Sequence, residues 1–243
     1  MCGQHRSDVI ELIKKKLVDN ESILVASTQL VEAGVDLDFP VVYRAFTGLD
    51  GIAQAAGRCN REGRLPQAGR VHVFHPPEGS PPGHLRHRED TARELLEDPP
   101  RDEVLHPENF QAYFRKLLKR LRGKIDEKNI EGMKTALSFE DIAREFRIIE
   151  DTDIPVVVPY GEGKKYMEEL RKGAPSRALL RKLQRYTVNV PEKKYEELEK
   201  AKSLEVEADM IAVLTNEDLY DDTLGFLMHK PADYHPPGST VIG

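Results

Sequence analysis

The chain has 243 residues, with 36 lysines and arginines against 42 aspartates and glutamates, and a formal net charge of −6. With 39% hydrophobic and 32% charged residues the composition is typical of a globular protein, and it excludes wholesale disorder and a histone-like grip on nucleic acid by bulk positive charge. Two cysteines suit a reducing cytoplasm, and no stretch reaches the roughly 18 apolar residues of a membrane span, so we expect a cytoplasmic protein with no membrane partner.

The first third of the chain is predicted to be α/β. Apolar residues at helical spacing predict a helix over 7–17. The wholly apolar runs 23–26 and 40–46 are typical of strands that are buried on both faces. A helix over 51–60 and a third strand over 71–75 follow. This alternation indicates a parallel sheet with helices packed on its faces.

A segment rich in proline and glycine, which we call the breaker, ends this part of the chain. Residues 76–83 hold four prolines and two glycines, which can continue neither a helix nor a strand, so we place a domain boundary there. Only three strands precede the breaker, where an independent α/β domain usually has four or more. We therefore expect that the front of the sheet is missing from this chain.

The remaining residues are predicted to form a second, α+β region. Expected helices cover 88–97, 108–122, 138–146, 164–171, 176–185 and 192–202, and expected strands cover 147–150, 155–159, 186–190 and 210–214. The helix 108–122 is amphipathic, and its polar face is crowded with basic residues that include Lys116, Lys119 and Arg120. Such a helix could line a nucleic-acid channel, and an ordinary solvated helix face is the alternative.

Polar residues follow the first predicted strand. Thr28 offers a hydroxyl group and an amide to a phosphate, Gly34 allows a close backbone approach, and Asp36 places a carboxylate at the same rim. Ligands bind at the C-terminal ends of parallel strands, so this loop is a candidate ligand site. A structural loop with no ligand is the alternative, because a strand followed by polar residues is common.

A second motif lies in the predicted helix 51–60. On a helix, Gln54, Arg58 and Arg61 stand at i, i+4 and i+7 and project from one face, where Gly57 leaves room for a close approach. Two guanidinium groups one turn apart repel each other unless an anion lies opposite. Their fork geometry and permanent charge suit a phosphoryl group in transfer, and a solvated basic face is the alternative.

Residues 27–38 and 54–64 resemble motifs V and VI of superfamily 2 helicases, the second being the pattern Q-x-x-G-R-x-x-R. The full sequence of these two segments is similar to that of the helicase–nuclease of type I CRISPR–Cas systems, as are the opening residues 2–6 and the segment 219–225. The resemblance implies a partial RecA-like parallel sheet over 1–77, a linker with a connecting helix over 78–105, and a mainly helical α+β accessory domain over 106–243.

The resemblance also implies an ATP-dependent 3′-to-5′ translocase on single-stranded DNA that a crRNA-guided surveillance complex recruits to degrade invading DNA. Arg58 and Arg61 would stabilise charge on the γ-phosphate of ATP, and Gln54 would help to order the site. Gly34 and Asp36 would line the nucleotide's edge, with Gly57 on the same wall.

The resemblance assigns other residues to DNA. Thr28 would contact the phosphate backbone of the tracking strand. His5 and Arg6 lie where the family has a further helicase motif, and they too would contact DNA. A lid of basic helices, to which Lys116, Lys119 and Arg120 belong, would close over the strand.

Several family signatures are absent from the sequence. There is no G-x-x-x-x-G-K-[ST] loop, no D-E-x-[HD] box and no His-Asp dipeptide, so we expect no metal site in this chain. The ATP site would be completed, and its Mg²⁺ held, by an N-terminal remainder of the helicase, so the chain alone should not hydrolyse ATP. A non-catalytic DNA- or partner-binding module and a piece of another superfamily 2 helicase are the alternatives.

Overall fold

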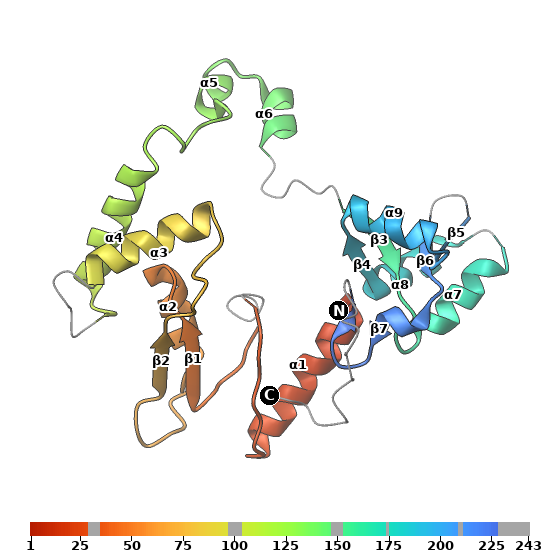
Figure 1. Cartoon of the computed structure of the whole chain (residues 1–243), viewed down its shortest axis with the longest axis horizontal. Helices are drawn as coiled ribbons and strands as arrows, with labels where there is room; N and C mark the ends of the chain where they lie inside the picture. The colour runs from red at the N-terminus through yellow and green to blue at the C-terminus, as the bar shows by residue number, and fades with distance from the viewer. Residues whose placement is uncertain (29–34, 97–103, 147–152, 174, 209–210, 228–243) are drawn as a thin grey trace. The chain divides into compact units, whose positions relative to one another are not determined.

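A computed structural model of the chain describes residues 1–28, 35–96, 104–146, 153–173, 175–208 and 211–227 (Figure 1). The chain forms two compact units. Unit 1 combines Met1–Ala26 with Glu150–Gly243, and unit 2 is Ser27–Ile149. The borders of these compact units differ from the domain borders that we expected after residues 77 and 105. The expected domain borders stay a prediction.

Unit 2 contains a pair of parallel strands, β1 (Val41–Ala45) and β2 (Arg70–Phe74), with α2 (Leu49–Ala56) between them in the chain. Both strands and their parallel pairing confirm the sequence prediction. The register sets Tyr43 opposite His72, and their rings stack with centroids 4.9 Å apart.

The prediction of a strand over residues 23–26 is wrong. Residues 23–26 form no strand, and Leu24 is 66% exposed, because a strand needs neighbours to pair with and the described sheet holds only β1 and β2.

Four more helices complete unit 2: α3 (His84–Leu96), α4 (Pro107–Arg120), α5 (Ile130–Thr135) and α6 (Phe139–Glu145). The pair α3 and α4 packs on α2 (Figure 1). The helix α4 begins with His106 as its N-cap, whose ring nitrogen accepts from the backbone N–H of Glu108, and with a proline in its first turn. Ser138 precedes α6, and its side chain makes no capping bond among the described residues.

The core of unit 2 joins the end of β1 to these helices. It consists of Phe46, Leu49, Ile52, Ala92, Leu95, Leu96, Tyr113 and Leu117. Phe46 stacks against His75, and the Arg93 guanidinium lies over the Phe46 ring at 5.3 Å. The first turn of α2, which leads to the second motif, is therefore anchored on α3 and α4.

Unit 1 is built on a four-stranded sheet in the order β4-β3-β6-β5. The strands are β3 (Ile154–Val157), β4 (Thr187–Val190), β5 (Leu204–Glu207) and β6 (Ile211–Leu214), and only β3 and β6 run parallel. A short hairpin of β7 (Tyr220–Asp221) and β8 (Gly225–Phe226) follows. The mixed α/β class is confirmed. The expected strand 147–150 lies outside the described residues.

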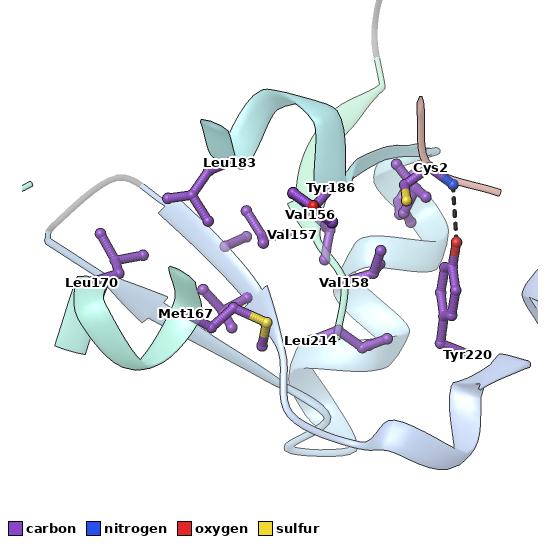
Figure 2. Packing of buried hydrophobic residues seen from close by; sticks show 14 of the residues in the cluster. Cys2, Val156, Val157, Val158, Met167, Leu170, Leu183, Tyr186, Leu214 and Tyr220 are labelled. Atoms are coloured by element: carbon purple, nitrogen blue, oxygen red, sulfur yellow. Dashed lines mark hydrogen bonds between the residues drawn. The ribbon is translucent and has the colours of Figure 1, made fainter. Parts of the chain in front are cut away.

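Helices cover this sheet. They are α1 (Gly3–Val18), α7 (Gly163–Arg171), α8 (Arg177–Leu183) and α9 (Glu192–Lys200), each of which overlaps a predicted helix. Valines 156, 157 and 158 of the central strand region pack against Met167, Leu170, Leu183 and Tyr186 in a shared core (Figure 2). Cys2 is completely buried, and its backbone N–H donates to the Tyr220 hydroxyl at 3.0 Å (Figure 2). This bond ties the start of α1 to β7.

Candidate functional site

The second motif does not lie on one helix. The helix α2 ends at Ala56, so Gln54 stands on its last turn while Arg58 and Arg61 lie in the turns that follow. The expectation that three side chains project from one helical face is therefore wrong. Gln54 and Gly57 are exposed, and Arg58 is half-buried.

The reason for this early end lies in the backbone. The Arg58 carbonyl accepts from the N–H of Phe39, and the N–H of Asn60 donates to the Phe39 carbonyl, both at 2.9 Å. These two bonds form a short parallel bridge between Phe39 and Cys59. Asn60 also has a φ of +48°, which a helix does not tolerate. The backbone after Ala56 thus pairs with the segment that leads into β1 instead of continuing the helix.

This pairing brings the first motif to the second. The Arg61 guanidinium forms an ion pair with Asp36. Asp38 accepts from the backbone N–H of Arg61 at 2.7 Å and from that of Glu62 at 3.2 Å. Sequence reasoning missed Asp38 as a positioning residue. Its signal was its place two residues after Asp36, but only the fold shows that it contacts the backbone of the second motif.

The ion pair between Asp36 and Arg61 is open to solvent. The Arg61 side chain is 43% exposed and that of Asp36 is 66% exposed. Exposed ion pairs contribute at most about 1 kcal/mol, so an incoming anion can compete for the guanidinium. Asp36 is thus placed to hold Arg61 in position rather than to bury it.

Two further residues of the first motif, Thr28 and Gly34, were expected to contact a ligand. Thr28 is exposed and belongs to no helix or strand. Gly34 lies outside the described residues, so its expected place at the nucleotide's edge stays a prediction.

His5 is a packing residue. It is 1% exposed, its ring stacks on Tyr160 with centroids 4.2 Å apart, and its Nδ1 lies 3.0 Å from the Tyr220 hydroxyl. Burial lowers the pKa of His5. A direct contact of the His5 side chain with DNA is therefore contradicted. Arg6, the next residue on α1, is exposed, and its contact with DNA stays a prediction.

The basic face of α4 is partly neutralised. Lys116 lies 2.8 Å from Glu94 of α3, and Arg120 pairs with Glu94 and with Asp90. The hydrogen bond from Lys116 is the largest cause of a lowered pKa at Glu94. These two cations hold α3 and α4 together, whereas Lys119 points its charge to solvent. The sequence showed the cations but not the carboxylates opposite them.

A partly buried polar cluster at the start of α2 escaped the sequence analysis. The Tyr113 hydroxyl donates to Asp50 at 2.9 Å, and Arg88 lies 3.1 Å from the other oxygen of that carboxylate. Gly48 makes this approach possible, because a Cβ there would stand 2.6 Å from the Asp50 Oδ1. Asp50 precedes Gln54 by one helical turn, so the cluster fixes the helix on which the second motif begins.

Two features are absent from the part of the chain that the structure describes. No group of three or more His, Cys, Asp or Glu side chains there is arranged to hold a metal ion. Within the same residues, no helix combines the length and the apolar composition that crossing a membrane requires.

The two motifs that resemble those of superfamily 2 helicases lie together in the fold, joined by Asp36, Asp38 and Arg61, and the second motif lies between the parallel strands β1 and β2 in the chain. Residues 2–64 match the family described as CRISPR-associated nuclease/helicase Cas3, C-terminal. The resemblance seen in the motifs is thus confirmed for this segment. The comparisons favour this family over another superfamily 2 helicase.

One curated protein is similar in sequence and one solved structure is similar in fold. Over 38 residues the chain is 58% identical to the CRISPR-associated nuclease/helicase Cas3 of Haloferax volcanii. These 38 residues are 16% of this chain and 4% of the relative. The fold matches a crystal structure of T. fusca Cas3 with ADP at a TM-score of 0.50 and 14% identity, over 87% of this chain and 31% of that one. The chain therefore spans only a small part of either relative.

Proposed function

We propose that this chain supplies one wall of the ATP site of a CRISPR-associated, ATP-dependent translocase on single-stranded DNA. The observation that carries the proposal is the junction of the two motifs, in which Asp36 and Asp38 fix the position of Arg61. The exposed guanidinium offers a fork of N–H donors to a phosphate. Arg58 and Gln54 lie on the same short segment and would complete this wall.

The residues present fit one side of a nucleotide and not the other. Arg58 and Arg61 would hold the γ-phosphate, and Gly57 would leave room beside them. When bound, ATP supplies the phosphoryl group whose transfer drives movement along DNA. This chain has no glycine-rich loop with its lysine and no acidic box, so a separate polypeptide would hold the β-phosphate and Mg²⁺. We therefore expect no ATP hydrolysis by this chain alone.

The proposed DNA contacts are smaller in number than the sequence suggested. Thr28 and Arg6 are exposed and keep their proposed contacts with the strand. Lys119 can reach a phosphate directly, while Lys116 and Arg120 would first have to leave the carboxylates of α3. The helicase remainder, single-stranded DNA and a crRNA-guided surveillance complex are the proposed partners.

The test is complementation. This chain is mixed with a polypeptide that carries the Walker lysine and the acidic box, and DNA-stimulated ATP hydrolysis is measured. We expect hydrolysis only in the mixture. Arg61→Ala should lower it by about a thousandfold, because arginine fingers contribute on this scale. Affinity for single-stranded DNA should stay within about twofold, since the proposed DNA contacts are left intact.

Arg64→Ala is the matched control, because Arg64 is an exposed arginine three residues further along, beyond the last position of the pattern Q-x-x-G-R-x-x-R. It should leave hydrolysis unchanged. Normal turnover by the Arg61→Ala variant would overturn the proposed ATP site. Binding of DNA or of the partner polypeptide with no hydrolysis in the mixture would instead indicate a non-catalytic binding module.

A further inference from the structure

The helix α4 is apolar over a wider face than its neighbours cover. Tyr113 and Leu117 are buried in the core of unit 2. Phe114 and Leu118, each one residue further on, are 44% and 55% exposed. They stand at i and i+4, so their side chains form one line along the helix. We call this pair the α4 stripe.

Positive charge borders the α4 stripe. Arg115 and Lys119 directly follow Phe114 and Leu118, so each cation lies about 100° further round the helix than its apolar neighbour. Neither side chain has an ion-pair or hydrogen-bond partner within the part of the chain that the structure describes. The inner cations of the same helix, in contrast, are paired with α3. An acidic partner would therefore be favoured at the outer face.

The hairpin of α5 and α6 has the complementary character. The two helices pack on each other, and neither contains a buried residue. Leu137, Phe139 and Phe146 are 70%, 65% and 60% exposed. Residues 130–146 hold four acidic and two basic side chains. Lys134 pairs with Glu131 and Arg144 with Asp141, so the surplus negative charge of the hairpin comes from Glu140 and Glu145. Helices of six and seven residues are not stable in water unless an apolar face is packed on a neighbour.

We propose that the α5–α6 hairpin of a second copy of this chain packs on the α4 stripe. In a two-fold dimer each copy would both give its hairpin and receive the other's. Phe139 and its apolar neighbours would cover Phe114 and Leu118, and the acidic residues of the hairpin would lie near Arg115 and Lys119. Within one chain the hairpin leaves the stripe exposed. This inference does not depend on the proposed ATP site.

Nucleic acid is a poorer match to the same surface. A phosphate backbone could pair with the two cations, but it would leave Leu118 and the three apolar side chains of the hairpin in water. A protein surface covers both sets at once. The stripe is therefore assigned to the second copy, and DNA becomes an outcome of the test.

The experiment is sedimentation velocity of the whole chain over a micromolar-to-millimolar concentration series. The wild-type chain should shift from monomer to dimer. Leu118→Glu on the stripe and Phe139→Lys on the hairpin should each raise the dissociation constant by at least about tenfold, because each places a charge in an apolar contact. Leu12→Glu, which alters an exposed leucine of α1 in unit 1, should leave it unchanged.

A mixture of the two variants tests the geometry. A mixed dimer retains one wild-type contact, and its other contact pairs the new glutamate with the new lysine, so mixing should restore the dimer. Circular dichroism shows that each variant folds. A wild-type chain that stays monomeric, a dimer that survives either variant, or a mixture that does not dimerise overturns the proposal. So does binding of single-stranded DNA that Leu118→Glu abolishes in a monomeric chain.

Discussion

Replacing Tyr113 by phenylalanine removes one hydroxyl group and leaves a fully buried ring in place. That hydroxyl donates to Asp50 in the first turn of α2, and the same carboxylate pairs with Arg88 of α3. Burial, followed by the bond to Asp50, raises the pKa of Tyr113 well above its usual range, so the phenol is a donor at any ordinary pH. The substitution therefore takes one donor from a carboxylate that α2, α3 and α4 share.

The magnitude follows from the partners. A hydrogen bond to a charged acceptor contributes about 1.5–3 kcal/mol to stability. Asp50 keeps its ion pair with Arg88, and its side chain is 21% exposed, so water can replace part of the lost bond. We expect Tyr113→Phe to lower the free energy of unfolding by about 1.5–2 kcal/mol, at the lower end of that range.

The assay is urea denaturation followed by far-ultraviolet circular dichroism, with amide hydrogen exchange to locate the loss. Exchange should quicken in α2, α3 and α4 and stay unchanged in unit 1. Tyr43→Phe is the matched control, because Tyr43 is 68% exposed in the same unit, and it should change stability by less than about 0.5 kcal/mol. If Tyr113→Phe costs no more than Tyr43→Phe, the hydroxyl does not hold the helices together.

Two further predictions concern packing and pH. Gly48→Ala should destabilise unit 2 by about 1–3 kcal/mol in the same denaturation assay, because the added Cβ would stand 2.8 Å from the Arg88 Cβ and would displace Tyr113. If the variant is as stable as the wild type, the side chains around Gly48 can move aside and the reasoning is wrong. In unit 1, burial lowers the pKa of His5, so the unfolded chain binds more protons below about pH 6.5, and stability should be full above that pH and fall as the pH drops. Hydrogen exchange in α1 at pH 7.5 and 5.5 checks this, and His5→Phe should flatten the difference.

Elements with strong local patterns were predictable. The strands β1 and β2 and the helices α3 and α4 follow from apolar runs and helical spacing, and each is present at nearly the expected residues. The strand over 23–26 failed for a physical reason, since its apolar run specifies burial but not the neighbours that would provide it. The strand β5 was overlooked because Leu204–Glu207 is short and alternates polar with apolar residues.

The candidate site was predictable in its residue types but not in its geometry. The pattern around Arg58 and Arg61 identified the motif, and the helical spacing then suggested a common face that the fold does not have. The helix ends early because its following residues pair with Phe39, a contact between segments 20 residues apart. The ion pair from Asp36 likewise depends on tertiary structure, which no local spacing encodes.

Unit 1 is assembled from two stretches of sequence that unit 2 separates. Cys2 meets Tyr220, which lies 218 positions further along the chain, so during synthesis the first helix leaves the ribosome long before the rest of unit 1 exists. Unit 2, whose contacts are all within one continuous stretch, can fold in the meantime. The docking of α1 in unit 1 is therefore expected to be a late step of folding, and its apolar residues stay open to solvent until residues after Glu150 have been made.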